Sequence, residues 1–343
     1  MKPYQLTSVI IILVILLTGC SPKKEIRFSG KTMGTIYHIK IVAWFFKDTK
    51  GLKDQIEKRL EEINRSMSIY KTDSEISRFN AEKSTAKKFY ASNDFLNVMT
   101  VAENIYKLSN GAWDGTIKPL VNLWGFNDPA IIKIIPKKEE IKNLLTDLGF
   151  NKIEILENRY FRKKNPSISL DLSSIAKGYA VDEVAKIIKI HEIENFLVEI
   201  GGEVYASGFK KDGRHWKVGI NTPKKDAPYN HVYKVISLSN KAVATSGDYR
   251  KFFEIEGKRY SHVIDPRTGY PVANGIISVS IMADTCTFAD GLATAIMVLG
   301  HKKGLDLVDR LDNVECLIVV EKKDGNIVDY CSKGFKDSIQ TDE

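Results

Sequence analysis

Cysteine is scarce in this chain of 343 residues, which contains only Cys20, Cys286, Cys316 and Cys331. No two of them form a Cys-x-x-Cys pair, and none is spaced with histidine as zinc ligands are. A zinc module and dithiol redox chemistry are therefore excluded. The three cysteines after Cys20 cannot all pair with one another. One disulfide stays open as an alternative, and it would join Cys316 to Cys331 if their segments lie side by side.

Two further absences exclude common classes of binding protein. The chain has no Gly-x-Gly-x-x-Gly segment, so a Rossmann dinucleotide site is not indicated. It has no arginine-rich run, and its formal net charge of +8 is spread over short lysine pairs, which argues against nucleic-acid binding. We expect a solvated surface near anionic lipid or a polyanionic ligand, with these pairs exposed on it: Lys137-Lys138, Lys163-Lys164 and Lys224-Lys225.

Long apolar runs are missing apart from one near the start, from Val9 to Leu17. This run is too short to cross a bilayer as a helix, which takes about 20 residues. It follows Lys2 and closes with Leu17-Thr18-Gly19-Cys20, the order of a bacterial lipoprotein signal. We expect residues 1–19 to be a signal peptide and Cys20 to carry diacylglycerol and palmitate. The alternative is an ordinary signal or a short anchor.

This reading places the protein on the bacterial membrane, facing the periplasm or the cell exterior. Residues 20–31 would be the lipid-anchored tether, residues 32–331 one folded domain, and residues 332–343 a polar tail.

Periodic apolar residues indicate helices interleaved with strands. Ile56, Leu60, Ile63 and Met67 recur at helical spacing, and the same pattern predicts helices over 53–67, 94–110, 136–149, 177–190 and 288–299. Segments rich in β-branched residues predict strands over 196–206, 216–221, 232–238, 242–245, 276–282, 316–320 and 327–330. The order has no regular β-α-β rhythm, so we predict an α+β fold with largely antiparallel sheets.

Polar motifs at the ends of these elements are candidates for chemistry. Asp171-Leu-Ser-Ser-Ile-Ala-Lys-Gly-Tyr-Ala-Val-Asp182 leads from a strand into a helix, where backbone N–H groups and Lys177 could bind an anion. A plain turn with a capping serine explains the segment equally well. Glu199-Ile-Gly-Gly-Glu203 reads as a strand whose paired glycines mark a bulge or a close backbone approach.

Two later motifs carry a candidate base and candidate metal ligands. His262 alternates with Ile264 in a strand-like register, so it is either a reactive group or a core histidine. Asp290 and Thr294 are four residues apart on a predicted helix, where a carboxylate and a hydroxyl on one face suit a hard divalent cation. For this pair alone, a helix-capping aspartate with a back-bonded threonine is the favoured alternative.

Taken together, these motifs resemble one family, the ApbE-type bacterial flavin transferases, which are FAD:protein FMN transferases formerly labelled thiamine-biosynthesis lipoproteins. The resemblance runs in the family's order from Met33 to about Gly300. Besides the motifs above, it includes Met33-Gly-Thr-Ile-Tyr37, Met67-Ser-Ile-Tyr-Lys-Thr-Asp-Ser-Glu-Ile-Ser-Arg-Phe-Asn80, Gly111-Ala-Trp-Asp114, Pro119-Leu-Val-Asn-Leu-Trp-Gly-Phe126 and Ser246-Gly-Asp-Tyr249.

The resemblance implies two lobes around a flavin cleft, with FAD as substrate and Mg²⁺ at its pyrophosphate. By position, the residues that would contact FAD are Met33, Tyr70, Ala112, Trp113, Asp114, Asp171, Lys177 and Ile264. The implied metal ligands are Ser174, Asp290 and Thr294, with Ala293 near the ion, and His262 is the implied base. Two departures from the family's pattern stand out: Trp113 is larger than usual, and Ala293 lacks a carboxylate that some members place there.

The implied reaction transfers FMN from FAD to a serine or threonine hydroxyl of an acceptor protein, releasing AMP. The implied acceptors are membrane redox subunits and other extracytoplasmic flavoproteins. Two rivals stay open: a magnesium-dependent FAD pyrophosphatase that uses water as the nucleophile, and a lipoprotein that binds FAD without chemistry. Asp290, Thr294 and His262 argue against a protein that only binds FAD. The residues do not distinguish a transferase from a hydrolase.

Overall fold

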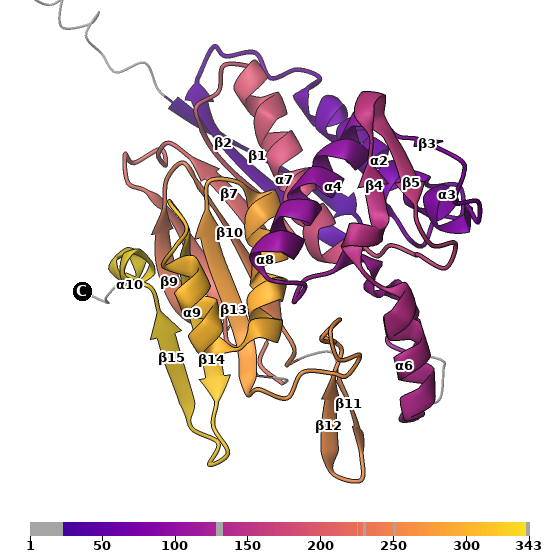
Figure 1. The fold of residues 1–343 in the computed structure, drawn as a ribbon. Helices are drawn as coiled ribbons and strands as arrows, with labels where there is room; N and C mark the ends of the chain where they lie inside the picture. The colour runs from indigo at the N-terminus through magenta and orange to yellow at the C-terminus, as the bar shows by residue number, and fades with distance from the viewer. Residues whose placement is uncertain (1–22, 128–132, 225, 229–230, 250–251, 341–343) are drawn as a thin grey trace, which may run out of the picture.

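A computed structural model describes residues 23–127, 133–224, 226–228, 231–249 and 252–340. Its centre is an eight-stranded sheet in the order β1-β2-β6-β7-β10-β13-β14-β15, and every neighbouring pair is antiparallel. The predicted α+β class with largely antiparallel sheet is confirmed (Figure 1). The strands are β1 (Lys23–Thr32), β2 (Thr35–Trp44), β6 (Asn195–Ile200), β7 (Glu203–Ser207), β10 (Lys241–Gly247), β13 (Ile276–Ala283), β14 (Glu315–Glu321) and β15 (Ile327–Cys331).

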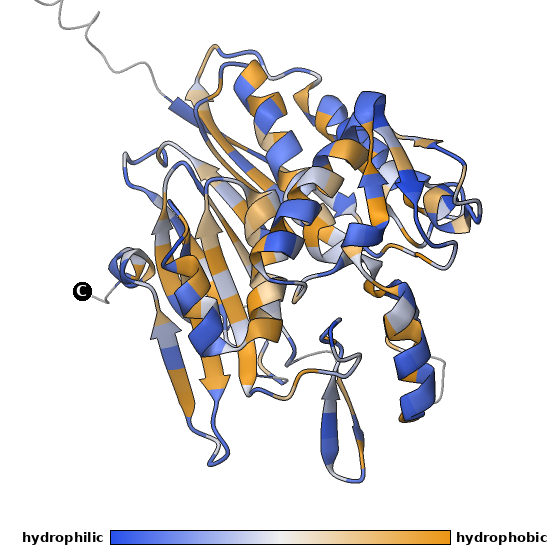
Figure 2. Cartoon of the chain, viewed as in Figure 1, coloured by the Kyte–Doolittle hydropathy of each residue, from blue (hydrophilic) through white to orange (hydrophobic). Residues whose placement is uncertain are grey.

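Helices cover one face of this sheet, and the larger hydrophobic core lies between the two layers. Figure 2 shows the hydropathy pattern that favours this arrangement. The outer helices carry stripes of polar residues, whereas α8, at the centre of the helical layer, is mostly apolar. The helices are α2 (Leu52–Met67), α3 (Glu75–Ala81), α4 (Asn93–Leu108), α5 (Lys118–Leu123), α6 (Lys138–Asp147), α7 (Ser173–Ile190), α8 (Cys286–Leu299), α9 (His301–Val308) and α10 (Lys333–Ser338). Across the described residues, no helix combines the length and the apolar character that crossing a bilayer requires.

The opposite face of the sheet is covered by a β-ribbon and by α10, which form a second core around Trp216 and Phe335. The ribbon pairs β8 (Trp216–Asn221) with β9 (Val232–Leu238). Two smaller sheets complete the fold: one contains β3 (Phe89–Tyr90), β5 (Tyr160–Lys163) and β4 (Ile153–Ile155), and the other pairs β11 (Phe252–Ile255) with β12 (Lys258–Ser261). Both faces of the sheet are therefore buried in its central strands, which explains why β7, β13 and β14 read as apolar runs.

Three expectations about the ends and turns of the elements were wrong. Residues 23–31 of the expected tether form most of β1, paired along its length with β2. The single strand expected over 196–206 is two strands, because Gly201 and Gly202 have φ of 63° and 102° and reverse the chain between β6 and β7. The polar tail includes α10, whose Phe335 is fully buried. The signal peptide and Cys20 lie outside the described residues.

The C-terminal hairpin brings Cys316 beside Cys331, as the order of the strands suggested. Leu317 pairs with Cys331, and the Ser332 N–H donates to the Cys316 carbonyl oxygen at 3.0 Å. Both thiols are nevertheless free in the structure. The hairpin is held by its backbone ladder.

Lys163 was expected on the surface, but its side chain is buried. It is 2% exposed, and its Nζ donates to the carbonyl oxygens of Ile168 at 2.8 Å, Glu82 at 2.9 Å and Asn80 at 3.3 Å. Burial lowers the pKa of Lys163 to about 8. This lysine of β5 joins the end of α3 to the loop before α7, because both segments present carbonyl groups that have to be satisfied away from water.

We expect Lys163→Met to lower the free energy of unfolding by about 3 kcal/mol or more, because each buried group that loses its partner costs about 1–3 kcal/mol. The matched control is Lys164→Met, since the Lys164 side chain is 53% exposed and should change stability by about 0.5 kcal/mol or less. Urea unfolding of the two variants makes the comparison. Equal losses of unfolding free energy in both variants would mean that the buried ammonium group does not hold these segments together.

Candidate functional site

The candidate site is built on the close packing of α7 against α8. A Cβ atom at Gly178 would lie 2.3 Å from the Cys286 carbonyl oxygen, so only glycine fits there. The Gly178 N–H donates to Asp290 Oδ2 at 3.0 Å. One turn further along α7, the Asp182 carboxylate accepts the N–H groups of Cys286 and Thr287, both at 2.8 Å, and so caps α8. The two helices therefore run antiparallel in a defined register.

This register brings the expected metal ligands Ser174, Asp290 and Thr294 to the same part of the helix pair. Ser174 lies one turn before Gly178, and Thr294 lies one turn after Asp290, so both extend the same antiparallel contact. Thr294 Oγ1 is 2.9 Å from the Ser246 hydroxyl oxygen of β10. Ser174 Oγ accepts a hydrogen bond of 3.0 Å from the Trp113 indole N–H. Three separate elements thus contribute hydroxyl groups around Asp290.

A buried cluster of charged groups lies beside these hydroxyls. The Lys177 ammonium group donates to Glu203 Oε1, and the Glu203 and Asp290 side chains are almost fully buried. Burial raises the pKa of both carboxyl groups. Burial also disfavours charged Lys177, yet the carboxylates of Asp290 and Glu203 together raise the pKa of Lys177 above its ordinary value. We conclude that Lys177 stays protonated and is shared by two carboxylates.

The donor set fits a hard divalent cation. Lys177 pairs with Glu203 and is attracted by the buried Asp290 carboxylate, and a bound cation would favour the charged form of both carboxyl groups against the cost of their burial. Glu203 Oε2 is buried and has no hydrogen-bond partner within the described part of the chain. The same part contains no group of three or more histidine, cysteine, aspartate or glutamate side chains that could hold a metal ion by themselves. A cation here would be held by Asp290 and hydroxyl oxygens and would complete its shell with phosphate and water, as Mg²⁺ does.

The expected flavin-contacting segments Ala112–Asp114 and Asp171 hold the entry to α7. The Asp114 carboxylate is used by the chain itself: it accepts the Thr116 N–H at 2.8 Å and the Phe150 N–H at 3.2 Å. Burial raises the pKa of this carboxyl group. The Asp171 N–H donates to the Gly115 carbonyl oxygen at 2.8 Å, directly after Asp114. Asp171 therefore positions the backbone at the first turn of α7, where it accepts the Ser173 N–H at 3.0 Å, and Asp114 orders the segment that Asp171 contacts.

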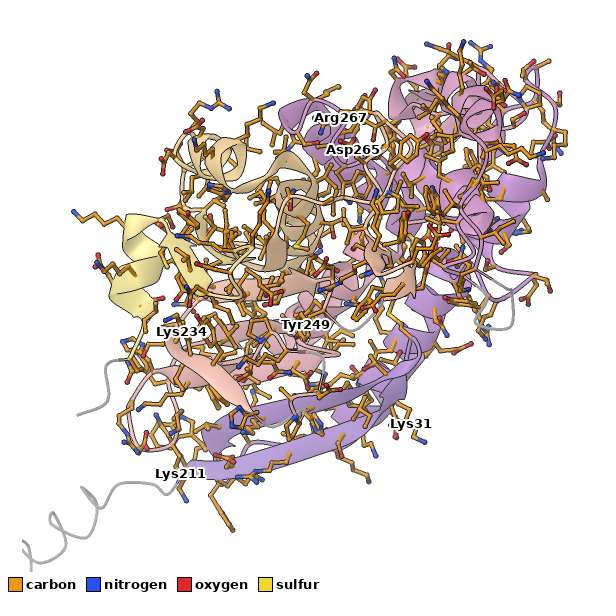
Figure 3. All side chains as sticks on the ribbon, turned by 90° about the horizontal axis from the view of Figure 1, so that it is seen from below. Lys31, Lys211, Lys234, Tyr249, Asp265 and Arg267 are labelled. Carbon is orange, nitrogen blue, oxygen red and sulfur yellow. The ribbon has the colours of Figure 1, made fainter. Side chains whose placement is uncertain are left out.

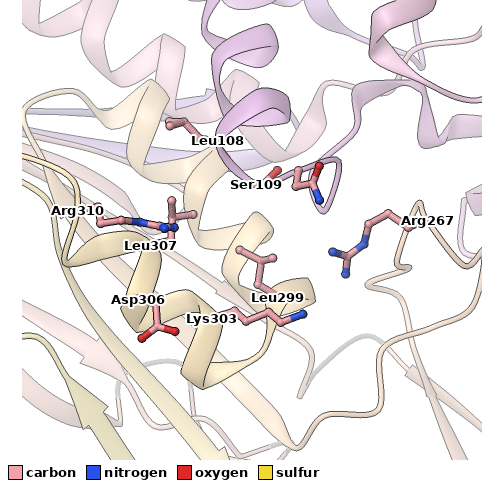
Figure 4. Close-up of a pocket in the computed structure, with 9 residues that line it drawn as sticks. Leu108, Ser109, Arg267, Leu299, Lys303, Asp306, Leu307 and Arg310 are labelled. Atoms are coloured by element: carbon pink, nitrogen blue, oxygen red, sulfur yellow. The ribbon is translucent and has the colours of Figure 1, made fainter.

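Cavities lie between this entry segment and the turn that follows Ile264. One, of 490 Å³, is lined by Gly111 and Asp114 on one side and by Pro266 and Arg267 on the other. A second, of 300 Å³, shares Arg267 and reaches α9 (Figure 4). Its charged lining residues are Arg267, Lys303, Asp306 and Arg310, an excess of positive charge that suits an anionic ligand. Two motifs far apart in the sequence thus form one concave surface.

The remaining candidate residues come from separate loops. His262 follows β12, is half-buried, and meets the Phe126 ring edge-to-face at 6.5 Å between centroids. Ile264 is buried in a small cluster with Leu120 and Trp124. Tyr70 is 79% exposed after α2. The hydrogen-bonded cluster around Asp290 includes neither Tyr70 nor Ile264 within the described residues.

Met33 sits in the turn between β1 and β2. Its φ is 48° and that of Gly34 is 74°, the backbone of a tight hairpin turn. Met33 is packed against the main core as a partly buried side chain. The structure places it by turn geometry and shows no polar contact through which it would recognise a ligand.

Sequence reasoning gave no role to Glu203, Asp182 and Ser246, although all three lie within the motifs it identified. Glu203 had a usable signal: it begins β7, a strand in which every residue is buried, and a carboxylate there needs a partner. Asp182 and Ser246 had no such signal, because their partners are on α8, more than 40 residues away in the sequence.

Comparison with known proteins identifies the family of this chain. The model of the ApbE family matches residues 33–318. The chain belongs to the ApbE family. Among its relatives, the protein named FAD:protein FMN transferase from Vibrio cholerae is 40% identical, covering 94% of this chain and 96% of the relative. The protein of the same name from Haemophilus influenzae is 37% identical, covering 95% of each chain.

Solved structures of ApbE proteins have the same fold. The flavin transferase ApbE from Vibrio cholerae superposes with a TM-score of 0.83 at 39% identity, covering 92% of this chain and all of that one. The apo form of the flavinyl transferase ApbE from Pseudomonas stutzeri also gives 0.83, at 33% identity, covering 94% of this chain and 98% of that one. The fold of this chain is therefore that of the solved ApbE structures.

Gly178→Ala should destabilise this ApbE protein by about 1–3 kcal/mol, because the added methyl group meets the backbone of α8. In an exposed helix the same substitution would stabilise by about 1 kcal/mol, so the sign of the effect tests the close approach. Urea unfolding gives the measurement. A gain in stability would show that α7 and α8 are not packed as described.

Proposed function

We propose that this protein is an FAD:protein FMN transferase that transfers FMN to a serine or threonine hydroxyl of an acceptor protein and releases AMP. Membership of the ApbE family and the names of its relatives support the activity. The observation that carries the proposal to this chain is the buried cluster of Lys177, Glu203 and Asp290, next to the hydroxyls of Thr294 and Ser246.

Asp290, Thr294 and Ser174 are the residues that would hold Mg²⁺ beside the pyrophosphate of FAD. When bound, the ion would offset negative charge that develops on the phosphate oxygens. Lys177 contributes a permanent positive charge in the first turns of α7, where the helix N-terminus also favours anions. Glu203 holds the Lys177 ammonium group in place through their ion pair.

His262 is the proposed general base. The acceptor hydroxyl oxygen forms a bond to the FMN-side phosphorus of FAD, the bond from that phosphorus to the AMP oxygen breaks, and the hydroxyl proton passes to the imidazole. A neutral imidazole suits this role near neutral pH. The half-buried position of His262 and its packing against Phe126 would orient the ring, and the cavity beside Arg267 lies just beyond the same turn.

We also propose that Cys20 carries the lipid and that the enzyme works outside the cytoplasm. The support is the sequence alone: the basic start, the short apolar run and the lipobox. Acceptors would then be extracytoplasmic or membrane-bound flavoproteins.

The activity is tested by incubating the protein with FAD, Mg²⁺ and a candidate acceptor, followed by in-gel flavin fluorescence and an AMP assay. Fluorescent acceptor together with AMP is the expected result. AMP and free FMN without labelled acceptor would favour a hydrolase. FAD binding without AMP would favour a carrier.

Asp290→Asn should lower the rate of AMP release by about a hundredfold or more at ordinary Mg²⁺, since a metal contribution is worth several kcal/mol. Asparagine keeps an oxygen that accepts the Gly178 N–H, so the fold should survive. Raising Mg²⁺ should partly restore the rate, and chelation of the wild type should mimic the variant. Asp312→Asn, at an exposed position, is the control. Superimposable Mg²⁺ curves for wild type and Asp290→Asn would mean that Asp290 only braces the two helices.

His262→Ala should still bind FAD but transfer FMN about 10²–10⁴-fold more slowly, the usual contribution of a general base. Flavin fluorescence titration gives the affinity, and AMP release gives the rate. His301→Ala is the matched control. It removes a histidine on α9 whose ring stacks on that of Tyr330, with 4.4 Å between the centroids. Loss of FAD binding in His262→Ala would indicate a structural histidine, and a normal rate would remove it from the mechanism.

A further inference from the structure

An exposed aromatic surface lies at the end of β2. Trp44, Phe45 and Phe46 are 45%, 67% and 77% exposed. Three consecutive aromatic side chains in water are costly to leave uncovered, and contiguous exposed apolar surface usually marks an interaction site. We call this group the aromatic end.

Other elements bring apolar side chains to the same end of the sheet. Val42 of β2 pairs with Asn195, the first residue of β6, and the Phe209 N–H donates to Asn195 Oδ1 at 2.8 Å. Phe209, which is 46% exposed, is therefore near the aromatic end. Ile190, which is 78% exposed, ends α7 just before β6 begins. Figure 1 shows the start of β1 and the last turn of α7 at this end of the molecule.

Lysine side chains surround this surface. Lys23 Nζ lies 5.3 Å from the Trp44 ring centroid, and Lys24 Nζ lies 5.8 Å from that of Phe45. Figure 3 shows Lys211, which follows Phe209 by two residues, at the end where β1 begins. Two of the carboxylates here have basic partners: Glu192 pairs with Lys47 at 3.1 Å, and Asp212 pairs with Lys210 at 3.6 Å and with Arg214 at 2.5 Å.

Exposed tryptophan and phenylalanine flanked by lysine is the composition found at the interface between a bilayer and water. The aromatic rings sit at the level of the lipid headgroups, and the lysines meet anionic phosphates. A protein partner could also cover such a surface. The sequence favours the membrane, because the proposed lipidated residue, Cys20, precedes Lys23 by three residues and cannot be more than about 11 Å from it.

We propose that the aromatic end docks on an anionic lipid surface, with Trp44, Phe45 and Phe46 inserted at headgroup level. The orientation of the enzyme follows from this contact. Helix α7 runs from Ser173 at the candidate site to Ile190 at the aromatic end, and its 18 residues span about 27 Å at 1.5 Å per residue. The candidate site would then face away from the bilayer at roughly that height, toward acceptor domains that project from the membrane.

The chain contains its own reporter for this contact. Its four tryptophans are Trp44, Trp113, Trp124 and Trp216, and the last three are at most 2% exposed. Bromine on lipid chains quenches tryptophan only on close contact. The lipidated full-length protein should be reconstituted into vesicles of phosphatidylcholine with brominated phosphatidylglycerol. We expect a blue shift and quenching of emission, and both should disappear in Trp44→Phe.

Variants separate docking from tethering by the lipid. Phe45→Ser/Phe46→Ser should lose most of the quenching of Trp44 although the protein stays anchored. Ile134→Ser/Ile135→Ser is the matched control, since these adjacent side chains are also exposed, at 65% and 47%, and should leave the quenching unchanged. Lys23→Gln/Lys24→Gln should reduce the quenching and remove its dependence on anionic lipid and salt.

Anchored wild-type protein whose Trp44 emission is not quenched by brominated lipid would overturn the proposal. So would a blue shift of Trp44 that appears only when a purified acceptor protein is added, because a protein would then cover this end. Quenching that is equal in wild type and Phe45→Ser/Phe46→Ser would show mere proximity imposed by the anchor and would also overturn it. None of these readouts depends on flavin transfer, so failure here is distinguishable from failure of the proposed activity.

Discussion

The contact between α7 and α8 at Gly178 is the constraint on which the site depends. It lets two helix backbones approach more closely than any side chain at that position would permit. The Gly178 N–H then reaches Asp290, and Asp182 reaches the start of α8. Because the register is held at two points, the residues one turn further on, Ser174 and Thr294, are positioned without a bond between them. A single small residue thus aligns groups from two distant motifs.

Charged side chains are buried at two places in the structure, and the two places differ in how completely their hydrogen bonds are satisfied. Lys163 is buried among carbonyl oxygens that satisfy it completely, so it acts as a structural link. The cluster of Lys177, Glu203 and Asp290 is not satisfied in this way, because one Glu203 carboxyl oxygen lacks a hydrogen-bond partner within the described residues. A fully hydrogen-bonded buried charge stabilises a fold, whereas an incompletely satisfied one is typical of a site that a ligand completes. This contrast is why the second cluster, and not the first, supports a function.

The success of the sequence predictions varied with the range of the interactions involved. The helix expected over 53–67 is present as α2, because its apolar spacing reports burial on one face directly. The strand expected over 196–206 failed, because local composition does not reveal that both glycines take positive φ and reverse the chain. Lys163 was misplaced for a similar reason: its partners are three carbonyl groups from other segments, which leave no mark in its own neighbourhood.

The sequence by itself determined the α+β class, the motifs and the family, because periodicity and residue type are local properties of the chain. It also placed Asp290 and Thr294 on one helix face. Only the tertiary structure decided that Glu203 pairs with Lys177, that Asp290 lies close enough to attract the same ammonium group, and that Ser246 is hydrogen-bonded to Thr294. Only the structure brought Phe209 to the same end of the sheet as Trp44, through the pairing of β2 with β6. These pairings depend on strand register and helix packing, which arise when distant segments bury their apolar faces together.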